Sequence, residues 1–328
     1  MNTEAASPLF RDPIYDGAAD PTVIWNRIEQ SWWIVYTNRR ANVAGPNLGW
    51  FHGTDLGVAA STDGGRTWLY RGTLRGLEFE PGRNTFWAPE IVFHDDLYHM
   101  YVSYLPGVPE AWTGPASIVH YTSANLWDWD FESVLRLDSD RVIDACVQQL
   151  PGGRWRMWYK DERHGQHTYA ADSSDLYHWT VVGPVITDRP HEGPNVFYWR
   201  GSYWMVTDPW DGIAVYRSDD AEMWSYLGLI LDAPSGRQDD GPRGHHADVL
   251  VVDDEAYIFY HTHPGALGRE QGPDLDFARR RSSLHCAQLG VDDTKRERLA
   301  CCRDGFQLVL PAGESPALEL SAPLAEGR

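Results

Sequence analysis

One pattern of hydrophobic and polar positions recurs along the chain and divides it into five similar units. Each unit starts with a short strand that carries a polar or small residue, and a second strand rich in Trp, Tyr and Val follows. A third strand then ends in Ser, and a turn and a Trp close the unit. The closing residues of the first four units are Trp68, Trp129, Trp179 and Trp224. Units of roughly 40–50 residues with about four strands are typical of propeller blades. The pattern therefore predicts an all-β fold, a five-bladed β-propeller with four-stranded blades around a central channel.

The repeat also predicts where the blades begin and end. We expect a single catalytic domain over residues 1–328, with blades at about 14–75, 85–135, 140–183, 190–230 and 244–312, and a loose tail from about residue 313. Glycines stand where tight hairpins need them, as in Asp63-Gly64-Gly65. The alternative all-β fold is a sandwich, but five copies of one motif favour radial repetition, and we see no amphipathic helix.

Composition and charge narrow the classes of partner. The chain of 328 residues contains 16 Trp and 16 Tyr, and its formal net charge is −19. Aromatic residues favour strands, and flat apolar rings also stack on sugar rings, although most of the Trp side chains are expected to fill the core. The negative charge argues against nucleic acid and anionic membranes as partners, because like charges repel. A neutral carbohydrate is compatible with it, and the oligomeric state stays open.

Targeting signals and cysteine spacing give an expectation about location. The first residues show no basic segment followed by an apolar run, and no stretch approaches the roughly eighteen apolar residues of a membrane span. The four cysteines, Cys146, Cys286, Cys301 and Cys302, show neither paired disulfide spacing nor a zinc motif. We therefore expect a reduced, cytoplasmic setting.

The inner strand of each blade lines the channel, so its polar residues carry the candidate chemistry. Aligned on a following apolar position, the five inner strands place Asp20, Ala88, Asp144, Glu192 and His246 at equivalent positions facing the axis. Crowded carboxylates cost desolvation and repulsion, which a purely structural channel would avoid. Asp144 is the most informative, because apolar residues flank it inside a strand, whereas Asp20 and Glu192 stand in turn-like settings. Glycoside hydrolysis needs such a set: one carboxyl that donates a proton and one that attacks or activates water.

The ordered motifs of the inner strands resemble those of family 43 glycoside hydrolases over most of residues 14 to 290. The resemblance rests on Ala19-Asp20-Pro21, Trp87-Ala88-Pro89-Glu90, Ile143-Asp144-Ala145 and Glu192-Gly193-Pro194. It implies an inverting hydrolase in which Asp20 is the general base, Glu192 is the general acid, and Asp144 raises the pKa of that acid and orients it. Family substrates are mostly α-L-arabinofuranosides and β-D-xylosides, with some galactosides. The chemistry requires no cofactor, and the expected setting favours a small oligosaccharide or glycoside.

Many members of the family also hold a structural calcium ion at the propeller axis, mostly through waters and beside a histidine, so the resemblance makes such an ion a candidate here. The segment Gly244-His245-His246-Ala247-Asp248-Val249 stands at this place, and its register selects His246, with His245 as the alternative. An axial histidine can equally be held by hydrogen bonds without a metal ion.

Further residues are candidates for contacts with the sugar because they stand near the expected mouth of the channel. They are Trp87, His52, Asp55, His191, His263 and Arg281. Each also has a structural interpretation, Trp87 as a residue between blades and His263 as an ordinary polar strand residue. Any of the three arginines at 279–281 could reach the substrate, since all precede the third strand of blade five.

Other functions on related folds stay open. The segment from Ser61 to Trp68 matches the Asp-box of sialidases, but this motif forms a hairpin corner and a sialidase would need six blades. A retaining fructosidase-type enzyme would use Asp20 as a nucleophile, and a sugar phosphorylase would need basic residues around a phosphate. A sugar-binding propeller without catalysis is the alternative from another class, and the intact set of three carboxyls argues against it.

Overall fold

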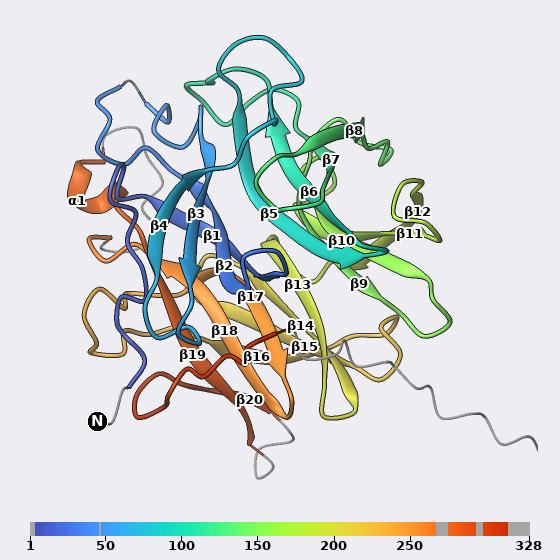
Figure 1. The fold of residues 1–328 in the computed structure, drawn as a ribbon. Coiled ribbons are helices and arrows are strands. Elements are labelled where there is room, and N and C mark those ends of the chain that lie inside the picture. The colour runs from blue at the N-terminus through green and yellow to red at the C-terminus, as the bar shows by residue number, and fades with distance from the viewer. Residues whose placement is uncertain (1–3, 46, 267–274, 293–297, 314–328) are drawn as a thin grey trace, which may run out of the picture.

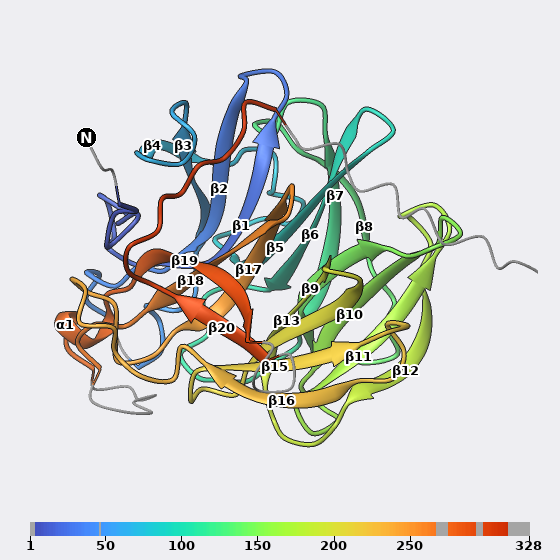
Figure 2. The same cartoon turned by 90° about the horizontal axis from the view of Figure 1, so that it is seen from below.

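The chain forms five four-stranded antiparallel sheets around a common centre, as the predicted propeller requires. The computed structural model describes residues 4–45, 47–266, 275–292 and 298–313. In this part the strands make five separate sheets (Figure 1). Each inner strand contacts the inner strands of both neighbouring blades, so the ring is closed (Figure 2). The five-bladed β-propeller is confirmed, whereas most of the expected tail, residues 314–328, lies outside the described residues.

The strands of each blade follow one another in sequence from the axis outward. Blade one contains β1 (Ala18–Asn26), β2 (Ser31–Asn38), β3 (Asp55–Ser61) and β4 (Leu69–Thr73). Blade two contains β5 (Thr85–His94), β6 (Leu97–Leu105), β7 (Ser117–Ser123) and β8 (Asp130–Val134). Blade three contains β9 (Val142–Gln149), β10 (Trp155–Asp161), β11 (His167–Ser173) and β12 (Thr180–Ile186). Blade four contains β13 (Glu192–Trp199), β14 (Ser202–Asp208), β15 (Ile213–Ser218) and β16 (Ser225–Ile230). Blade five contains β17 (His245–Val252), β18 (Glu255–Thr262), β19 (Ser283–Asp292) and β20 (Arg298–Cys302), and a four-residue helix α1 (Phe277–Arg280) precedes β19. No helix in the described ranges is long and apolar enough to cross a membrane.

The second strands explain the apolar runs of the sequence. All residues of β2, β10 and β14 are buried, because a blade in a propeller is covered on both faces by its neighbours. Trp33, Trp158 and Trp204 pack in these layers and are at most 2% exposed. The outer strand β8 is largely exposed, and β4 is exposed in part. Most of the tryptophans of the repeat thus form the core between blades.

A side-chain bridge closes the hairpin between the third and fourth strands of four blades. In blade one, the hydroxyl of Ser61 accepts the backbone N–H of Gly65, and Asp63 accepts the N–H and hydroxyl of Thr67. The serines Ser123, Ser173 and Ser218 take the same place in the next three blades. The Asp-box residues lie outside the pocket described below, so they shape a hairpin corner and carry no chemistry.

Both ends of the described chain tie blade five to blade one. Phe10 pairs with Leu284 of β19, and its ring lies 5.4 Å from that of Tyr36 in β2. After β20 forms the outer strand of blade five, the chain runs along blade one, where the Leu310 N–H donates to the carbonyl of Gly64 and the Trp32 indole donates to the carbonyl of Pro311. These contacts join blade five to blade one, and each of the two blades is built from four consecutive strands of its own.

A buried pair of histidines in blade two, on the face that packs against Tyr177 of blade three, makes stability depend on pH. His99 Nδ1 lies 3.0 Å from His120 Nε2, and both side chains are at most 3% exposed. Burial lowers the pKa of His99 to about 4 and that of His120 to about 3. The unfolded chain therefore binds more protons than the folded chain once the pH falls below about 6.5, and stability is lost toward about pH 4.

We expect each ring to reduce the free energy of unfolding by about 2 kcal/mol between about pH 7 and pH 5, and the pair by nearly twice that, because both rings bind a proton in the unfolded chain and stay neutral in the folded chain. Urea unfolding at both pH values measures the loss. The His99→Gln/His120→Gln variant should lose less stability over this interval than the parent. The exposed His178→Gln serves as the matched control, and an equal loss in all three proteins would contradict the prediction.

Candidate active site

A β-bulge in each inner strand turns one residue toward the axis. The register of all five inner strands shifts at the same place, and one residue there has a left-handed backbone. The five residues, with their φ angles, are Asp20 (47°), Ala88 (47°), Asp144 (60°), Gly193 (56°) and His246 (31°). Positive φ is uncommon for residues other than glycine, and residues with this backbone conformation are concentrated at functional sites.

The alignment predicted from the sequence is wrong by one residue in blade four. Gly193, and not Glu192, is the left-handed residue there, so Glu192 is equivalent to Trp87 and Ile143, which precede the bulges of blades two and three. A Cβ on Gly193 would lie 2.9 Å from the ring of His246, which explains why glycine stands at this position. Glu192 therefore reaches the pocket from a different point of the strand than Asp20 and Asp144.

Hydrogen bonds between neighbouring blades hold the bulges in place. In four blades the backbone N–H of the left-handed residue donates to a side chain on the second strand of the preceding blade. The pairs are Asp20 with His261, Ala88 with Thr37, Asp144 with Ser103, and His246 with Asp208, at 2.8–3.3 Å. In blade four the corresponding second-strand residue is Lys160, which has no acceptor, and the Gly193 N–H donates instead to Asp144 Oδ2 at 3.1 Å. This exception links Asp144 directly to the strand that carries Glu192.

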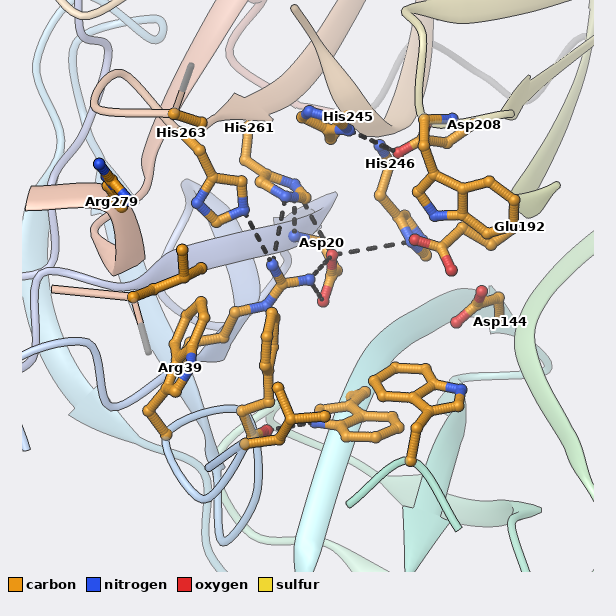
Figure 3. A pocket seen from close by; sticks show the side chains of 18 of the residues that line it. Asp20, Arg39, Asp144, Glu192, Asp208, His245, His246, His261, His263 and Arg279 are labelled. Carbon is orange, nitrogen blue, oxygen red and sulfur yellow. Dashed lines mark hydrogen bonds and ion pairs between the residues drawn. The ribbon is translucent and has the colours of Figure 1, made fainter. Parts of the chain in front are cut away.

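The three predicted catalytic carboxyls meet in one pocket at the axis. A cavity of about 530 Å³ is lined by Asp20, Asp144 and Glu192 (Figure 3). The side chains of Asp144 and Glu192 point toward one another, and Asp20 lies farther along the same wall. The rings of Trp50, Phe51, Trp112 and Trp87 contact one another in this order and form an aromatic wall of the pocket, and Trp210 also lines it. The rings of Trp87 and Trp112 stack with centroids 5.3 Å apart, which gives a flat apolar face of the kind on which sugar rings bind.

Asp20 is held as a carboxylate by a buried guanidinium. Arg39 Nη2 donates to both carboxylate oxygens, at 2.9 and 3.1 Å, and the two side chains are 12% and 4% exposed. Burial alone would raise the pKa of Asp20, but the charges of Arg39 and His246 outweigh it and lower the pKa below its usual range. Asp20 is therefore an ionised carboxylate across the neutral range and is suited to accept a proton.

Asp144 and Glu192 have different electrostatic surroundings. Burial is the largest cause that raises the pKa of Asp144, to about 7, and the neighbouring carboxylate of Glu192 adds to it. Glu192 is 21% exposed and pairs with the ammonium of Lys160 at 3.1 Å. The pocket thus holds one ionised carboxylate, one carboxyl that carries a proton near neutral pH, and one carboxyl with a buried cation beside it.

The axial histidines do not form a site for a directly bound metal ion. His246 Nδ1 lies 3.7 Å from Asp20 Oδ1, and His245 Nδ1 lies 3.0 Å from Asp208 Oδ2. Burial would lower the pKa of His246, but Asp144, Asp20 and Glu192 together raise it. No group of three His, Cys, Asp or Glu side chains in the described ranges is arranged to hold a metal ion. These residues therefore do not fit a calcium ion bound directly by protein ligands, and the positive charge of His246 stands among the carboxylates instead.

Of the six residues predicted to contact the sugar, Trp87 and His263 line the pocket. Trp87 donates its indole N–H to the carbonyl of Phe51 at 2.7 Å, which fixes the plane of the aromatic wall. His263 Nε2 accepts from Arg39 Nη1 at 3.2 Å, and Nδ1 donates to the carbonyl of Arg281. Burial and the charge of Arg39 lower the pKa of His263 to about 3, so the ring is neutral and supports the guanidinium.

The other four lie outside the lining of the pocket. His52 is buried behind Trp87 with ring centroids 5.0 Å apart, and Asp55 is exposed and pairs with Arg83. His191 is fully buried between Thr168 and the carbonyl of Arg189. Arg281 forms two hydrogen bonds with Asp239, at 3.1 and 2.7 Å. The structure therefore does not bring these four residues to the pocket lining, and their contact with the sugar stays a prediction.

Several residues of the pocket were not predicted. Arg39, which directly follows β2, lines the pocket, and Lys160, near the end of β10, lies behind the lining. Nothing in the local sequence marks either residue as a partner for Asp20 or Glu192. Of the three arginines at 279–281, which the sequence could not tell apart, Arg279 lines the pocket and Arg281 does not. Trp50, Phe51 and Trp112 come from loops between the second and third strands of blades one and two, and loops carry no periodicity. Aromatic residues are no more frequent in these two loops than in the chain as a whole, so the sequence carried no signal for them.

Comparisons with known proteins agree with this architecture. Neither protein-family models nor curated protein sequences give a match. Among solved structures, a family-43 enzyme from Xanthomonas citri complexed with xylotriose has a TM-score of 0.67 at 16% identity, over 94% of this chain and 97% of that one. A family-43 β-xylosidase/α-arabinofuranosidase from a compost microbial metagenome, in a calcium-free form with xylotriose, has a TM-score of 0.65 at 16% identity, over 89% and 96%. A family-43 β-1,3-galactosidase with galactodeoxynojirimycin has a TM-score of 0.63 at 13% identity, over 87% and 94%. The chain therefore has the five-bladed fold of these family-43 glycoside hydrolases along nearly its whole length.

Proposed function

We propose that the protein is a glycoside hydrolase that cleaves small arabinofuranosides, xylosides or galactosides with inversion at the anomeric carbon. The observation that carries the proposal is the convergence of Asp20, Asp144 and Glu192 in one pocket with an aromatic wall. The likeness to structures described as xylosidase, arabinofuranosidase and galactosidase supports the substrate class. A cavity of about 530 Å³ has room for a small oligosaccharide or a glycoside.

The three carboxyls have separate tasks in this mechanism. Asp20, which Arg39 keeps ionised, takes a proton from the attacking water while the oxygen of that water forms the new bond to the anomeric carbon. Glu192 donates a proton to the leaving oxygen as the glycosidic bond breaks. Asp144 lies beside Glu192 and shares the acidic proton with it, because two neighbouring carboxyls do not readily ionise together. His246 balances the negative charge of the group.

The test is hydrolysis of a panel of 4-nitrophenyl glycosides, beginning with α-L-arabinofuranoside, β-D-xyloside and the galactosides. We expect turnover of at least one, and proton NMR of the first product should show the anomer opposite to that of the substrate. A product with the anomer of the substrate would replace the inverting mechanism by a retaining one. Binding of these sugars without any turnover would support the non-catalytic alternative and refute the enzyme.

We also propose a cytoplasmic location, and the state of the cysteines supports it. Cys146, Cys286, Cys301 and Cys302 are all free, which fits a reducing compartment. Fractionation of the source cells, with an antibody against the protein, would test this location. Recovery of the protein from the medium would contradict it.

A further inference from the structure

Lys160 lies behind Glu192, and the mechanism above gives it no task. Its side chain is 1% exposed, and its Nζ lies 3.1 Å from Glu192 Oε2 and 3.2 Å from Glu162 Oε1. Nζ also lies 5.3 Å from the ring centroid of Trp210, which lines the pocket. A buried ammonium is stable only when it is paired, so Lys160 favours the ionised form of both carboxyls.

Glu162 anchors Lys160 in this position. The Glu162 side chain is 5% exposed, and it accepts hydrogen bonds from the guanidinium of Arg141 and from the indole N–H of Trp112. Arg141 also donates to the carbonyl of Gly114, so the start of β9 and the loop that carries Trp112 and Gly114 together fix this carboxylate. The ammonium of Lys160 is therefore held at Glu192 by a rigid support that does not depend on the substrate.

Among the residues that the structure describes, no cation contacts the carboxylate of Asp144. It is 4% exposed, and Oδ2 accepts the backbone N–H of Gly193 at 3.1 Å. His246 and Lys160 act on it through space, whereas Lys160 contacts Glu192 itself. Of two neighbouring carboxyls, the one without the contacting cation holds a shared proton more readily.

We propose that Lys160 keeps Glu192 ionised in the free protein, so that the proton used in catalysis rests on Asp144 until substrate is bound. Asp144 then passes this proton to a carboxylate oxygen of Glu192 and becomes ionised. Glu192 delivers it to the glycosidic oxygen, which takes the electron pair of the breaking bond, and Asp20 takes one proton from water. The delivery of this proton to a glycosidic oxygen rests on the proposed function, whereas the position of the proton on Asp144 in the free protein does not. Lys160 acts through Glu192 and is a positioning residue.

Charged and titratable groups from four blades face Asp144 and Glu192 and influence their proton affinities. Among the described residues these are Asp20 and Arg39 of blade one, Lys160 and Glu162 of blade three, Asp208 of blade four, and His245 and His246 of blade five. Replacement of Lys160 removes one positive charge from the group without touching the pocket lining. The group should then bind an additional proton, and Glu192 is the carboxyl that receives it.

Infrared difference spectra of the carboxylic acid C=O band locate the proton without any substrate. At about pH 6, below the pKa of Asp144 of about 7, the parent should show an acid band that Asp144→Asn removes and Glu192→Gln leaves. Lys160→Met should gain a band that Lys160→Met/Glu192→Gln lacks. Asp248 and Glu90 are buried elsewhere in the channel with raised pKa values, so Asp248→Asn and Glu90→Gln identify the background bands.

Loss of the parent band in Glu192→Gln, or a Lys160→Met spectrum without a new band, would overturn the inference. If Lys160→Met does not fold, the comparison of the parent with Asp144→Asn and Glu192→Gln still decides where the proton rests. With an active substrate, Lys160→Met should move the basic limb of the kcat/KM profile to higher pH, because the acid loses its proton less readily. An unmoved limb in a hydrolysing parent refutes the role of Lys160 and leaves the glycosidase intact, whereas a parent that hydrolyses nothing refutes the glycosidase alone.

Discussion

Replacement of Glu192 by Gln should lower kcat/KM for glycosides with poor leaving groups by about 10³-fold, within the range for loss of general acid catalysis. The amide cannot donate a proton to the leaving oxygen, yet it keeps the size of the side chain. A dinitrophenyl glycoside needs little protonation, so its hydrolysis should fall far less. Initial rates with a series of aryl glycosides of decreasing leaving-group acidity measure the difference.

The same series with Glu78→Gln provides the matched control, because Glu78 is an exposed glutamate outside the pocket. Its rates should equal those of the parent for every leaving group. A loss in Glu192→Gln that is the same for good and poor leaving groups would show that Glu192 has a role other than the acid. Hydrolysis of an unactivated glycoside at the parental rate would remove Glu192 from the mechanism.

Replacement of Asp20 by Asn should lower kcat by about 10³-fold for all substrates, because activation of water is needed whatever group leaves. The effect should therefore be uniform across the aryl series, in contrast to that of Glu192→Gln. Asp55→Asn is the matched control, since Asp55 is exposed and pairs with Arg83 away from the pocket. Steady-state rates across the series separate the two carboxyls.

Loss of Asp20 also leaves the guanidinium of Arg39 buried without its ion pair, which costs roughly 3–5 kcal/mol in comparable pairs. The thermal unfolding and the sugar binding of the Asp20→Asn variant should therefore be measured together with its kinetics. Asp20→Asn/Arg39→Met removes both charges, so it should regain part of the stability while it stays inactive. Recovery of activity together with stability would mean that Asp20 acts only through the fold.

The sequence by itself determined the architecture, because the signals for a propeller are local and repeated. Strands covered on both faces need apolar runs such as Ser31–Asn38, and a hairpin corner needs a side chain such as Asp63 to accept its backbone N–H groups. The apolar second strand recurs in all five blades and the hairpin corner in four of them, so the signal becomes stronger with each repeat. The carboxyls Asp20, Asp144 and Glu192 were found because polar residues in inner strands are costly without a function.

The tertiary structure alone decided how these carboxyls are charged and from where they reach the pocket. A bulge position depends on the contact between Gly193 and the ring of His246 in the next blade, so the alignment along blade four could not be read from its own residues. Arg39 meets Asp20 and Lys160 meets Glu192 through pairings between strands and blades. Loops far apart in the sequence supply the aromatic wall. Proton affinity and substrate contact are set by groups that are distant along the chain, and only the closed ring brings them together.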